Sequence, residues 1–163
     1  MRATEADKEN QVNGSSSSGD NDDLMGYSIE DLSVGMTAIF AKTVTEADIV
    51  LFAGISGDIN PVHLNHEFAT ETMFEGRIAH GMLTASFIST VIGTKLPGPG
   101  AIYLKQSLNF KAPVRAGDTV RARVTIKEVI AEKRRIVMDT IATVGDTEVL
   151  DGEALILVPS HKA

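Results

Sequence analysis

Cysteine is absent from all 163 residues of the chain. Its absence excludes disulfide frameworks, Cys-ligated zinc, iron–sulfur clusters and thiol nucleophiles. No apolar run approaches the ~20 residues that a membrane-spanning helix needs, and the polar, acidic N-terminal stretch lacks the apolar segment of a signal peptide. Positive charge is also scarce, and a net charge of −7 argues against broad binding to nucleic-acid phosphates. We therefore expect a soluble, cytoplasmic protein that binds neither membrane nor nucleic acid.

The residues that are present suffice for one folded domain. Hydrophobic residues make up 43% of the chain, a share typical of soluble globular domains. Residues 1–26 hold six acidic and two basic residues, a net of −4 that leaves −3 for the other 137. This segment includes the run Ser15–Ser18 and has too few apolar residues to offset the entropy of ordering. We expect residues 1–26 to form a disordered tail and residues 27–163 to form the domain.

Apolar spacing predicts three helices in the first half of this domain. The sequence Thr45-Glu-Ala-Asp48 has the spacing of an N-terminal capping box, and a helical apolar pattern follows it as far as Gly54–Gly57. Asn65 can cap a second, short helix that begins at His66. The segment Ala79–Gly93 is apolar on almost every side. Such a pattern indicates a helix that is buried rather than one that lies on the surface.

Alternation of apolar and polar residues predicts five strands. They are Met36–Val44, 102–111, 120–127, Arg135–Val144 and 148–158. The apolar sets in two of them are Ile102, Leu104, Leu108 and Phe110, and then Val120, Ala122, Val124 and Ile126. Turns are expected at Gly117-Asp118, at residues 131–134 and at Gly145-Asp146. One-sided alternation is typical of antiparallel strands with one face on the core.

One wholly apolar helix and about five antiparallel strands have few packing solutions. The helix Ala79–Gly93 can be apolar all round only if a curved sheet wraps much of it and something else covers the rest. The predicted class is therefore α+β, with an antiparallel sheet wrapped around one long buried helix, a hot-dog fold. Such a sheet has an exposed edge that a two-fold partner would bury. We expect a homodimer or a dimer of dimers.

The residues suited to chemistry gather in one stretch, FAGISGDINPVH, which spans residues 52–63. Asp58 and His63 are five residues apart, and Asn60-Pro61 between them enforces a turn or an extended path. A carboxylate and an imidazole on one rigid loop can hold the same water from two sides, and His exchanges protons near neutral pH. The alternative is a purely structural loop, in which Asp58 and Asn60 make Asx turns and His63 packs.

The longer pattern of residues 52–63, followed by five residues and then Ala69, resembles the hydratase 2 motif of MaoC-like, (R)-specific enoyl-CoA hydratases at every specified position. The segment FEGRIAHGM, residues 74–82, is also similar to the helix-entry sequence of this family. The resemblance extends from about Ile29 to Pro159 and leaves the acidic tail outside. It favours a functional role for the loop over the structural alternative.

This resemblance implies a dimeric hot-dog hydro-lyase that adds water reversibly to trans-2-enoyl-CoA and gives (R)-3-hydroxyacyl-CoA. Short chains such as crotonyl-CoA are the expected substrates. Bacterial members supply polyhydroxyalkanoate synthesis or take part in acyl-CoA and fatty acid metabolism. Family knowledge assigns catalysis to Asp58 and His63, loop support to Asn60, a backbone donor to Gly81 and a supporting hydroxyl to Ser89.

The reaction itself requires a donor for the thioester oxygen. Attack of water on C3 moves charge onto that oxygen, and backbone N–H groups at a helix N-terminus are suited to hold it. His80-Gly81 lies where the predicted buried helix begins, and a glycine lets substrate approach the backbone closely. For His80 we expect a capping or packing role rather than direct catalysis. No cofactor is required, because the thioester activates C2–C3 and coenzyme A is part of the substrate.

Other candidate sites are weaker. His63, His66 and Glu67 lack a third histidine and any zinc-binding spacing, so we expect no metal site. Ser86 and Ser89 have no G-x-S-x-G setting for nucleophilic chemistry, and Ser89 can instead be a core hydroxyl bonded to a helix carbonyl. Cations that qualify for coenzyme A phosphates by sign alone are Lys105, Lys111, Arg115, Arg134 and Arg135.

Two other classes of function fit the predicted fold. A thioesterase would direct water at the carbonyl carbon instead of C3, and a non-catalytic domain would bind acyl thioesters without turnover. The ordered combination of Asp58, Asn60 and His63 favours the hydratase over the first, and the presence of both Asp58 and His63 speaks against the second.

Overall fold

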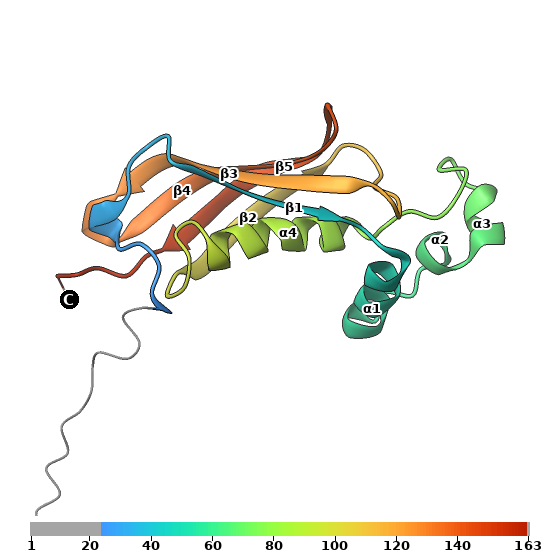
Figure 1. The fold of residues 1–163 in the computed structure, drawn as a ribbon, viewed down its shortest axis with the longest axis horizontal. Helices are drawn as coiled ribbons and strands as arrows, with labels where there is room; N and C mark the ends of the chain where they lie inside the picture. Colours follow the sequence, from blue (N-terminus) through green and yellow to red (C-terminus); the bar gives the residue numbers. More distant parts are fainter. Residues whose placement is uncertain (1–23, 163) are drawn as a thin grey trace, which may run out of the picture.

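The computed structural model describes residues 24–162, and within them five antiparallel strands form one sheet in the order β1-β3-β4-β5-β2 (Figure 1). The strands are β1 (Thr37–Thr43), β2 (Ile102–Phe110), β3 (Thr119–Ile130), β4 (Arg135–Val144) and β5 (Thr147–Leu157). The helices are α1 (Glu46–Ser56), α2 (Pro61–Leu64), α3 (His66–Thr70) and α4 (Gly81–Thr94), with 3-10 turns η2 (Ile29–Asp31) and η3 (Ala131–Lys133). The predicted tail lies outside the described residues except for Leu24–Gly26, where Gly26 N–H donates to the Pro99 carbonyl.

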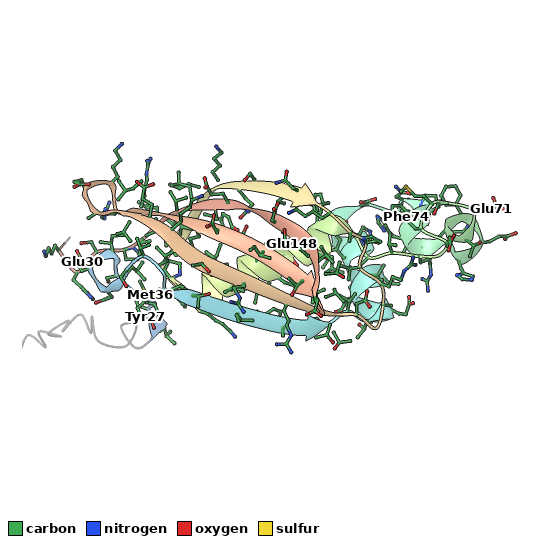
Figure 2. All side chains as sticks on the ribbon, turned by 90° about the horizontal axis from the view of Figure 1, so that it is seen from above. Tyr27, Glu30, Met36, Glu71, Phe74 and Glu148 are labelled. Atoms are coloured by element: carbon green, nitrogen blue, oxygen red, sulfur yellow. The ribbon has the colours of Figure 1, made fainter. Side chains whose placement is uncertain are left out.

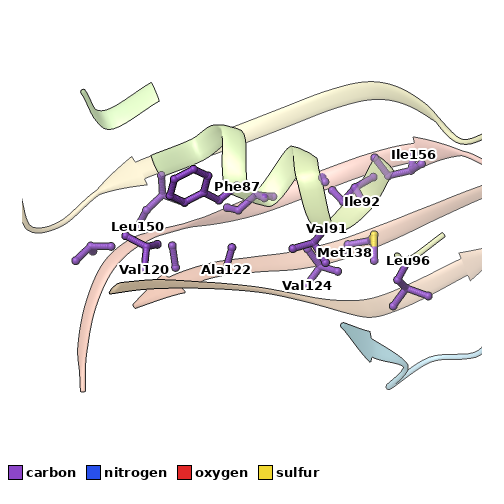
Figure 3. Packing of buried hydrophobic residues seen from close by; sticks show 14 of the residues in the cluster. Phe87, Val91, Ile92, Leu96, Val120, Ala122, Val124, Met138, Leu150 and Ile156 are labelled. Atoms are coloured by element: carbon purple, nitrogen blue, oxygen red, sulfur yellow. The ribbon is translucent and has the colours of Figure 1, made fainter. Parts of the chain in front are cut away.

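Helix α4 lies along one face of the sheet and packs on β1, β3 and β4. Figure 3 shows Val91 of α4 beside Val124 and Met138 of the sheet, with Phe87 near Leu150 and Ile92 towards Ile156. The alternating set predicted in β3 is buried, since Val120, Ala122, Val124 and Ile126 are each at most 1% exposed. The α+β hot-dog arrangement is confirmed, and the burial of this set against α4 forms the centre of the core.

Helix α4 is not covered on every side within one chain. Leu83, Phe87, Ile88, Val91 and Ile92 are buried, whereas Gly81, Met82, Ser89, Gly93 and Thr94 are exposed. The five strands of the described chain cover only the first of these faces. The second face consists mostly of small residues. It is the part of the helix that, by the sequence prediction, an element other than the sheet covers.

Strand β2 departs from the predicted one-sided burial. Ile102, Leu104 and Phe110 are 43–55% exposed, and within this set only Leu108 is partly buried against the core. The register with β5 shifts between Tyr103 and Lys105, so a bulge interrupts the alternation. Because β2 is also an edge strand, nothing in the described chain covers its apolar residues.

The three short helices lie beyond one end of the sheet (Figure 1). Figure 2 shows Glu71 and Phe74 at that end and Tyr27 and Glu30 at the opposite end. Helix α3 begins at His66 with Asn65 as its cap, as the sequence predicts. The backbone at Asn60 is close to extended, with φ −50° and ψ 127°, as the sequence predicts, but the short helix α2 that follows it was not predicted. Asn60 caps α2, and Pro61 occupies its first position, where the missing N–H costs nothing. None of the helices in residues 24–162 has the length and apolar character that crossing a membrane requires.

Candidate active site

The loop between α1 and α2 is held firmly at both ends. Thr45 and Asp48 form the predicted capping box at the start of α1, and a hydrogen bond from Lys42 lowers the pKa of Asp48 to about 2. Gly57 ends α1 in the left-handed region, with φ 76°, and its N–H donates to the Ala53 carbonyl. This conformation suits glycine because a Cβ is strained there. The chain therefore leaves α1 in a fixed direction towards Asp58.

Asp58 and His63 face one another across the start of α2. Asp58 Oδ2 lies 4.0 Å from His63 Nε2, with the His63 side chain 10% exposed and that of Asp58 52% exposed. Asn60 N–H donates to Asp58 Oδ1, and Val62 N–H donates to Asn60 Oδ1. Asn60 thus supports the loop through its backbone and its cap, while the second carboxylate oxygen faces the imidazole.

The hydrogen bonds of His63 determine which nitrogen is free. Nδ1 lies 2.9 Å from the Ile78 carbonyl oxygen, which can only accept. Nδ1 must therefore carry the hydrogen, and in the neutral ring Nε2 keeps its lone pair. That lone pair is on the nitrogen nearest Asp58. The site consequently offers two acceptors, a carboxylate oxygen and an imidazole nitrogen, at a distance that one water can bridge.

His80, the residue before α4, completes this cluster and is missing from the set predicted from sequence. Its Nε2 lies 2.9 Å from the backbone oxygen of Asp58, and its ring stacks on that of His63 with centroids 3.8 Å apart. Its side chain makes no N-terminal cap bond to α4. The capping role considered for His80 is therefore absent. In the sequence, a role for His80 is indicated by its position next to Gly81. Its contact with Asp58 depends on the fold and cannot be predicted from the local sequence.

A cavity of about 460 Å³ opens beside this cluster. Asp58, His63, His80 and Gly81 line it, together with residues that are largely apolar. The remaining lining residues are Met73, Phe74, Ile78, Ala79, Met82, Thr84, Phe110, Lys111, Ala112, Pro113, Val114 and Val149. The volume is in the range of small-molecule pockets. The cavity therefore combines an apolar wall with a few convergent polar groups.

Gly81 lies at the first position of α4 and lines this cavity. The N–H of a first helical residue has no intrahelical acceptor and is directed away from the helix. A Cβ built on Gly81 would lie 2.8 Å from Cε1 of the Phe110 ring. Gly81 is thus close to Asp58 and His63 at the cavity, and it has no space for a side chain.

Ser89 lies apart from the other predicted site residues. It is exposed on α4 and does not line the cavity. Eight residues separate it from Gly81, which is about 12 Å along a helix. In the single chain Ser89 is therefore remote from Asp58 and His63, and its supporting role stays a prediction.

Three of the side chains at the site are potential metal ligands. Asp58, His63 and His80 each offer a ligand atom within 4.8 Å of the other two, a different set from His63, His66 and Glu67. The two rings are stacked with an interplanar angle of 30° and centroids 3.8 Å apart. At this angle and spacing the two ring planes meet roughly 6–7 Å from the ring centroids. A shared zinc ion would have to lie in both planes, at about 2.0–2.1 Å from each ligand nitrogen. The geometry therefore disfavours joint ligation by both histidines, and the absence of a metal stays a prediction.

Arg115 anchors the loop that forms one wall of the cavity. Its guanidinium donates to the backbone carbonyls of Phe74 and Arg77, and Ala79 N–H donates to the Val114 carbonyl beside it. The loop includes Glu75, which has φ 53°. The position of Arg115 was noted in the sequence only for its charge. Its observed contacts are structural, and they bring the loop against the sheet.

Loss of this anchor should loosen the wall formed by the loop. We expect Arg115→Met to raise KM for crotonyl-CoA about fivefold, because one hydrogen bond is worth about 1 kcal/mol, and to change kcat much less. Steady-state kinetics of Arg115→Met and of Arg121→Met, an exposed control on β3, will check this. Equal KM values in the two variants would show that the wall does not depend on Arg115.

The other cations considered for phosphate binding contribute little to the cavity. Of that set only Lys111 lines it, and its ammonium pairs with Glu148 and Asp151. The hydrogen bond from Lys111 to Asp151 is the main cause that raises the pKa of this exposed lysine. Lys105, Arg134 and Arg135 lie away from the cavity lining.

Comparison with known proteins gives a consistent result. The family model described as "MaoC like domain" matches residues 33–148. The chain is 54% identical over 140 residues to an (R)-specific enoyl-CoA hydratase of Rhodospirillum rubrum, a match that covers 86% of this chain and 97% of that protein. It is 55% identical over 133 residues to a 3-hydroxybutyryl-CoA dehydratase of Methylorubrum extorquens, which covers 82% and 85%.

Solved structures agree with these matches. An R-hydratase from Pseudomonas aeruginosa superposes with a TM-score of 0.79 at 42% identity, covering 83% of this chain and 88% of that one. An (R)-hydratase from Aeromonas caviae involved in PHA biosynthesis superposes with a TM-score of 0.77 at 41% identity, covering 80% and 99%. These structural matches therefore cover about four fifths of this chain.

Proposed function

The chain belongs to the MaoC-like domain family, and from this premise we propose that it is an (R)-specific enoyl-CoA hydratase whose catalytic residues are Asp58 and His63. As a hydro-lyase it adds water reversibly across C2–C3 of a trans-2-enoyl-CoA. Coenzyme A is part of the substrate, and the proposed reaction needs no separate cofactor. The similar proteins are named as (R)-specific enoyl-CoA hydratase and 3-hydroxybutyryl-CoA dehydratase.

The observation that carries the proposal is the 4.0 Å separation between Asp58 Oδ2 and His63 Nε2. A water with ordinary hydrogen bonds of about 2.8 Å to both atoms would make an angle of about 90° between them. Both atoms can accept, so both hydrogens of this water are engaged and its oxygen lone pairs face the cavity. That oxygen is the nucleophile that attack on C3 requires.

The proposed reaction then follows from the charges that develop. Water oxygen bonds to C3, the C2–C3 π pair moves to the thioester oxygen, and one water proton passes to the Asp58–His63 pair. The N–H of Gly81 at the start of α4 stabilises the resulting enolate oxygen. The pair returns a proton to C2 as the enolate collapses, so atoms and charge balance without an external acid.

The direct test measures both the reaction and its stereochemistry. Incubation with crotonyl-CoA should remove the enoyl absorbance without releasing free thiol, and chiral analysis should identify (R)-3-hydroxybutyryl-CoA. Because Asp58 and His63 are only 4.0 Å apart where they line the cavity, water should reach one face of the bound enoyl group. Thiol release would support the thioesterase, binding without turnover would support an acyl-thioester binding domain, and an (S)-product would contradict the assignment.

We also propose that the working unit is a homodimer or a dimer of dimers. The free edge of β2, the exposed apolar side chains Ile102, Leu104 and Phe110, and the uncovered face of α4 support it. Edge strands of this kind pair readily with another chain. Light scattering at micromolar concentration should give at least twice the monomer mass of 17.4 kDa. A monomer mass would count against this assembly.

The preferred acyl chain is proposed to be short. Support comes from the name of the Methylorubrum protein, a dehydratase of a four-carbon hydroxyacyl-CoA, and from the compact cavity of about 460 Å³. Rates with enoyl-CoAs of four to twelve carbons will test this preference. Cytoplasmic location and the lack of nucleic-acid or membrane partners remain expectations from composition.

A further inference from the structure

The mechanism proposed for Asp58 and His63 leaves one buried titratable side chain without a task. His80 is 1% exposed, so it is more deeply buried than either of the two residues that face the water. It comes from a different part of the chain, the start of α4, and yet it contacts both of them. A buried ring with specific contacts to both members of a reacting pair requires an explanation beyond filling space.

The first contact fixes the backbone that carries Asp58. His80 Nε2 and the Asp58 carbonyl oxygen are 2.9 Å apart, and a carbonyl oxygen can only accept. Nε2 must therefore be the protonated nitrogen. Twenty-two residues separate the two positions, so this bond joins the catalytic loop directly to the N-terminus of α4. The carboxylate of Asp58 and the N–H of Gly81 are thereby held in one frame.

The second contact fixes the plane of the His63 ring. The His80 ring stacks on it at 3.8 Å between centroids, and Phe52 of α1 packs on His80 at 5.1 Å. His63 is already bonded to the Ile78 carbonyl through Nδ1, and the stack prevents the ring from turning about that bond. The lone pair on Nε2 is thus kept in the direction of the bridging water.

The remaining nitrogen of His80 limits its charge state. Nδ1 is buried and has no hydrogen-bond partner among residues 24–162. A doubly protonated His80 would place an unbonded N–H and a positive charge against the His63 ring, which belongs to the pair that takes the proton in the proposed mechanism. A neutral ring with its hydrogen on Nε2 avoids both penalties. This nitrogen therefore stays unprotonated in the working enzyme.

We propose that His80 is a positioning residue, which acts as the neutral Nε2–H tautomer to hold the Asp58 backbone and the His63 ring in the geometry that binds the nucleophilic water. This inference rests on the roles proposed above for Asp58 and His63. His80 touches neither the water nor the substrate carbon in this scheme, and its effect passes through the two residues it contacts. Loss of the contact should therefore lower kcat and leave KM nearly unchanged.

Two amide variants that differ by one methylene test the proposal. The terminal nitrogen of Gln can occupy the place of His Nε2 and donate to the Asp58 carbonyl, whereas Asn is too short to reach it. We expect His80→Asn to lower kcat for crotonyl-CoA at least about tenfold with KM within about threefold of wild type. His80→Gln should lose clearly less kcat than His80→Asn, because it restores the hydrogen bond to the Asp58 carbonyl although not the stack on the His63 ring.

Thermal stability, measured beside kcat, distinguishes a positioning role of His80 from a role in packing alone. His80 is the N-cap of α4 without a side-chain cap bond, and Asn is among the best N-cap residues. His80→Asn therefore gains a cap that offsets part of the lost packing, and its thermal stability should not fall in proportion to its kcat. Phe52→Leu, which alters the packing on His80 and keeps its hydrogen bond, should lower thermal stability and leave kcat within about threefold. Equal kcat in the Asn and Gln variants, or kcat that tracks stability in all three, would overturn the proposal.

A spectroscopic measurement tests the tautomer without any assay of activity. Nitrogen-15 histidine NMR of the wild-type protein at neutral pH should show His80 with hydrogen on Nε2 only and His63 with hydrogen on Nδ1. A doubly protonated His80, or hydrogen on its Nδ1, would contradict the proposal. Failure of the proposed function is distinct, because it would appear as wild-type protein without hydratase turnover, or as Asp58 and His63 variants with wild-type rates.

Discussion

Asp58→Asn and His63→Gln should each lower kcat for crotonyl-CoA hydration at least about a hundredfold, since a general acid–base group typically contributes about 10²–10⁴-fold. Each change preserves the size of the side chain and removes its ability to take a proton. In the proposed mechanism Asp58 Oδ2 and His63 Nε2, which are 4.0 Å apart, hold one water between them, so neither residue can orient it alone. KM should change much less, because coenzyme A is bound away from the water.

The double variant Asp58→Asn/His63→Gln should be scarcely slower than the poorer single variant. Residues that act as one unit show strongly non-additive losses, because removal of the first already abolishes the function of the pair. Independent groups would instead multiply their losses. Because the proposed mechanism has the two residues share a water, we treat them as one titrating system rather than assign the base to one of them.

Steady-state kinetics of the wild type, both single variants and the double variant will decide this, with circular dichroism to check that each is folded. Asn60→Ala is an informative companion. It removes the N-cap of α2 and keeps both catalytic side chains, so it should lower stability by about 1 kcal/mol. A full multiplicative loss in the double variant would indicate separate roles for Asp58 and His63. Wild-type kcat in either single variant would remove that residue from the mechanism.

The central strands and the long helix were predictable because their burial depends on local pattern. From Val120 to Ile126 of β3 every second residue is apolar and buried, so period and environment agree. Arg135–Val144 is a strand with the predicted bounds, and Gly145, with φ 55°, makes the turn that follows it. The start of α1 was equally clear, since Thr45 and Asp48 satisfy each other's backbone N–H groups.

Strand β2 and helix α2 show where local pattern is insufficient. The apolar residues of β2 alternate as if one face were buried, but that strand is at the edge and carries a bulge at Leu104. Whether the apolar residues of β2 are buried depends on what lies beyond the edge of the sheet. The alternation of residues within the strand does not show this. Helix α2 has only four residues, too few to show a helical period, and only its cap residues identify it.

The site was partly predictable for a similar reason. Asp58, Asn60 and His63 lie within six residues, so one motif brings them together. His80 joins them through a hydrogen bond that spans 22 residues and depends on how α4 meets the catalytic loop. Ser89 illustrates the opposite limit, because the motif resemblance assigns it to the site and the single chain leaves it exposed on α4.

Gly81→Ala should lower kcat/KM for crotonyl-CoA by at least about tenfold, while the N–H itself is retained. The added Cβ would lie 2.8 Å and 2.9 Å from two carbons of the Phe110 ring, so the ring or the start of α4 must shift. Because Gly81 and Phe110 both line the cavity, either movement changes its shape at the point where the thioester oxygen is proposed to bind. Loss of a single oxyanion donor in other enzymes costs about 10²–10³ in kcat, and a displaced donor should cost a substantial part of that.

The effect of this change on stability should be small, which separates it from unfolding. Alanine is favoured over glycine inside helices by about 0.5–1 kcal/mol, and this gain offsets part of the strain against Phe110. Gly54→Ala is the matched control, because a Cβ on this α1 glycine meets no atom within 4 Å. It should keep kcat/KM and raise the melting temperature slightly.

Relief of the clash in Gly81→Ala/Phe110→Leu should recover part of the lost rate. A Gly81→Ala enzyme with wild-type kcat/KM would show that the thioester oxygen is held elsewhere, and the N-terminus of α4 would then have no role in stabilising the enolate.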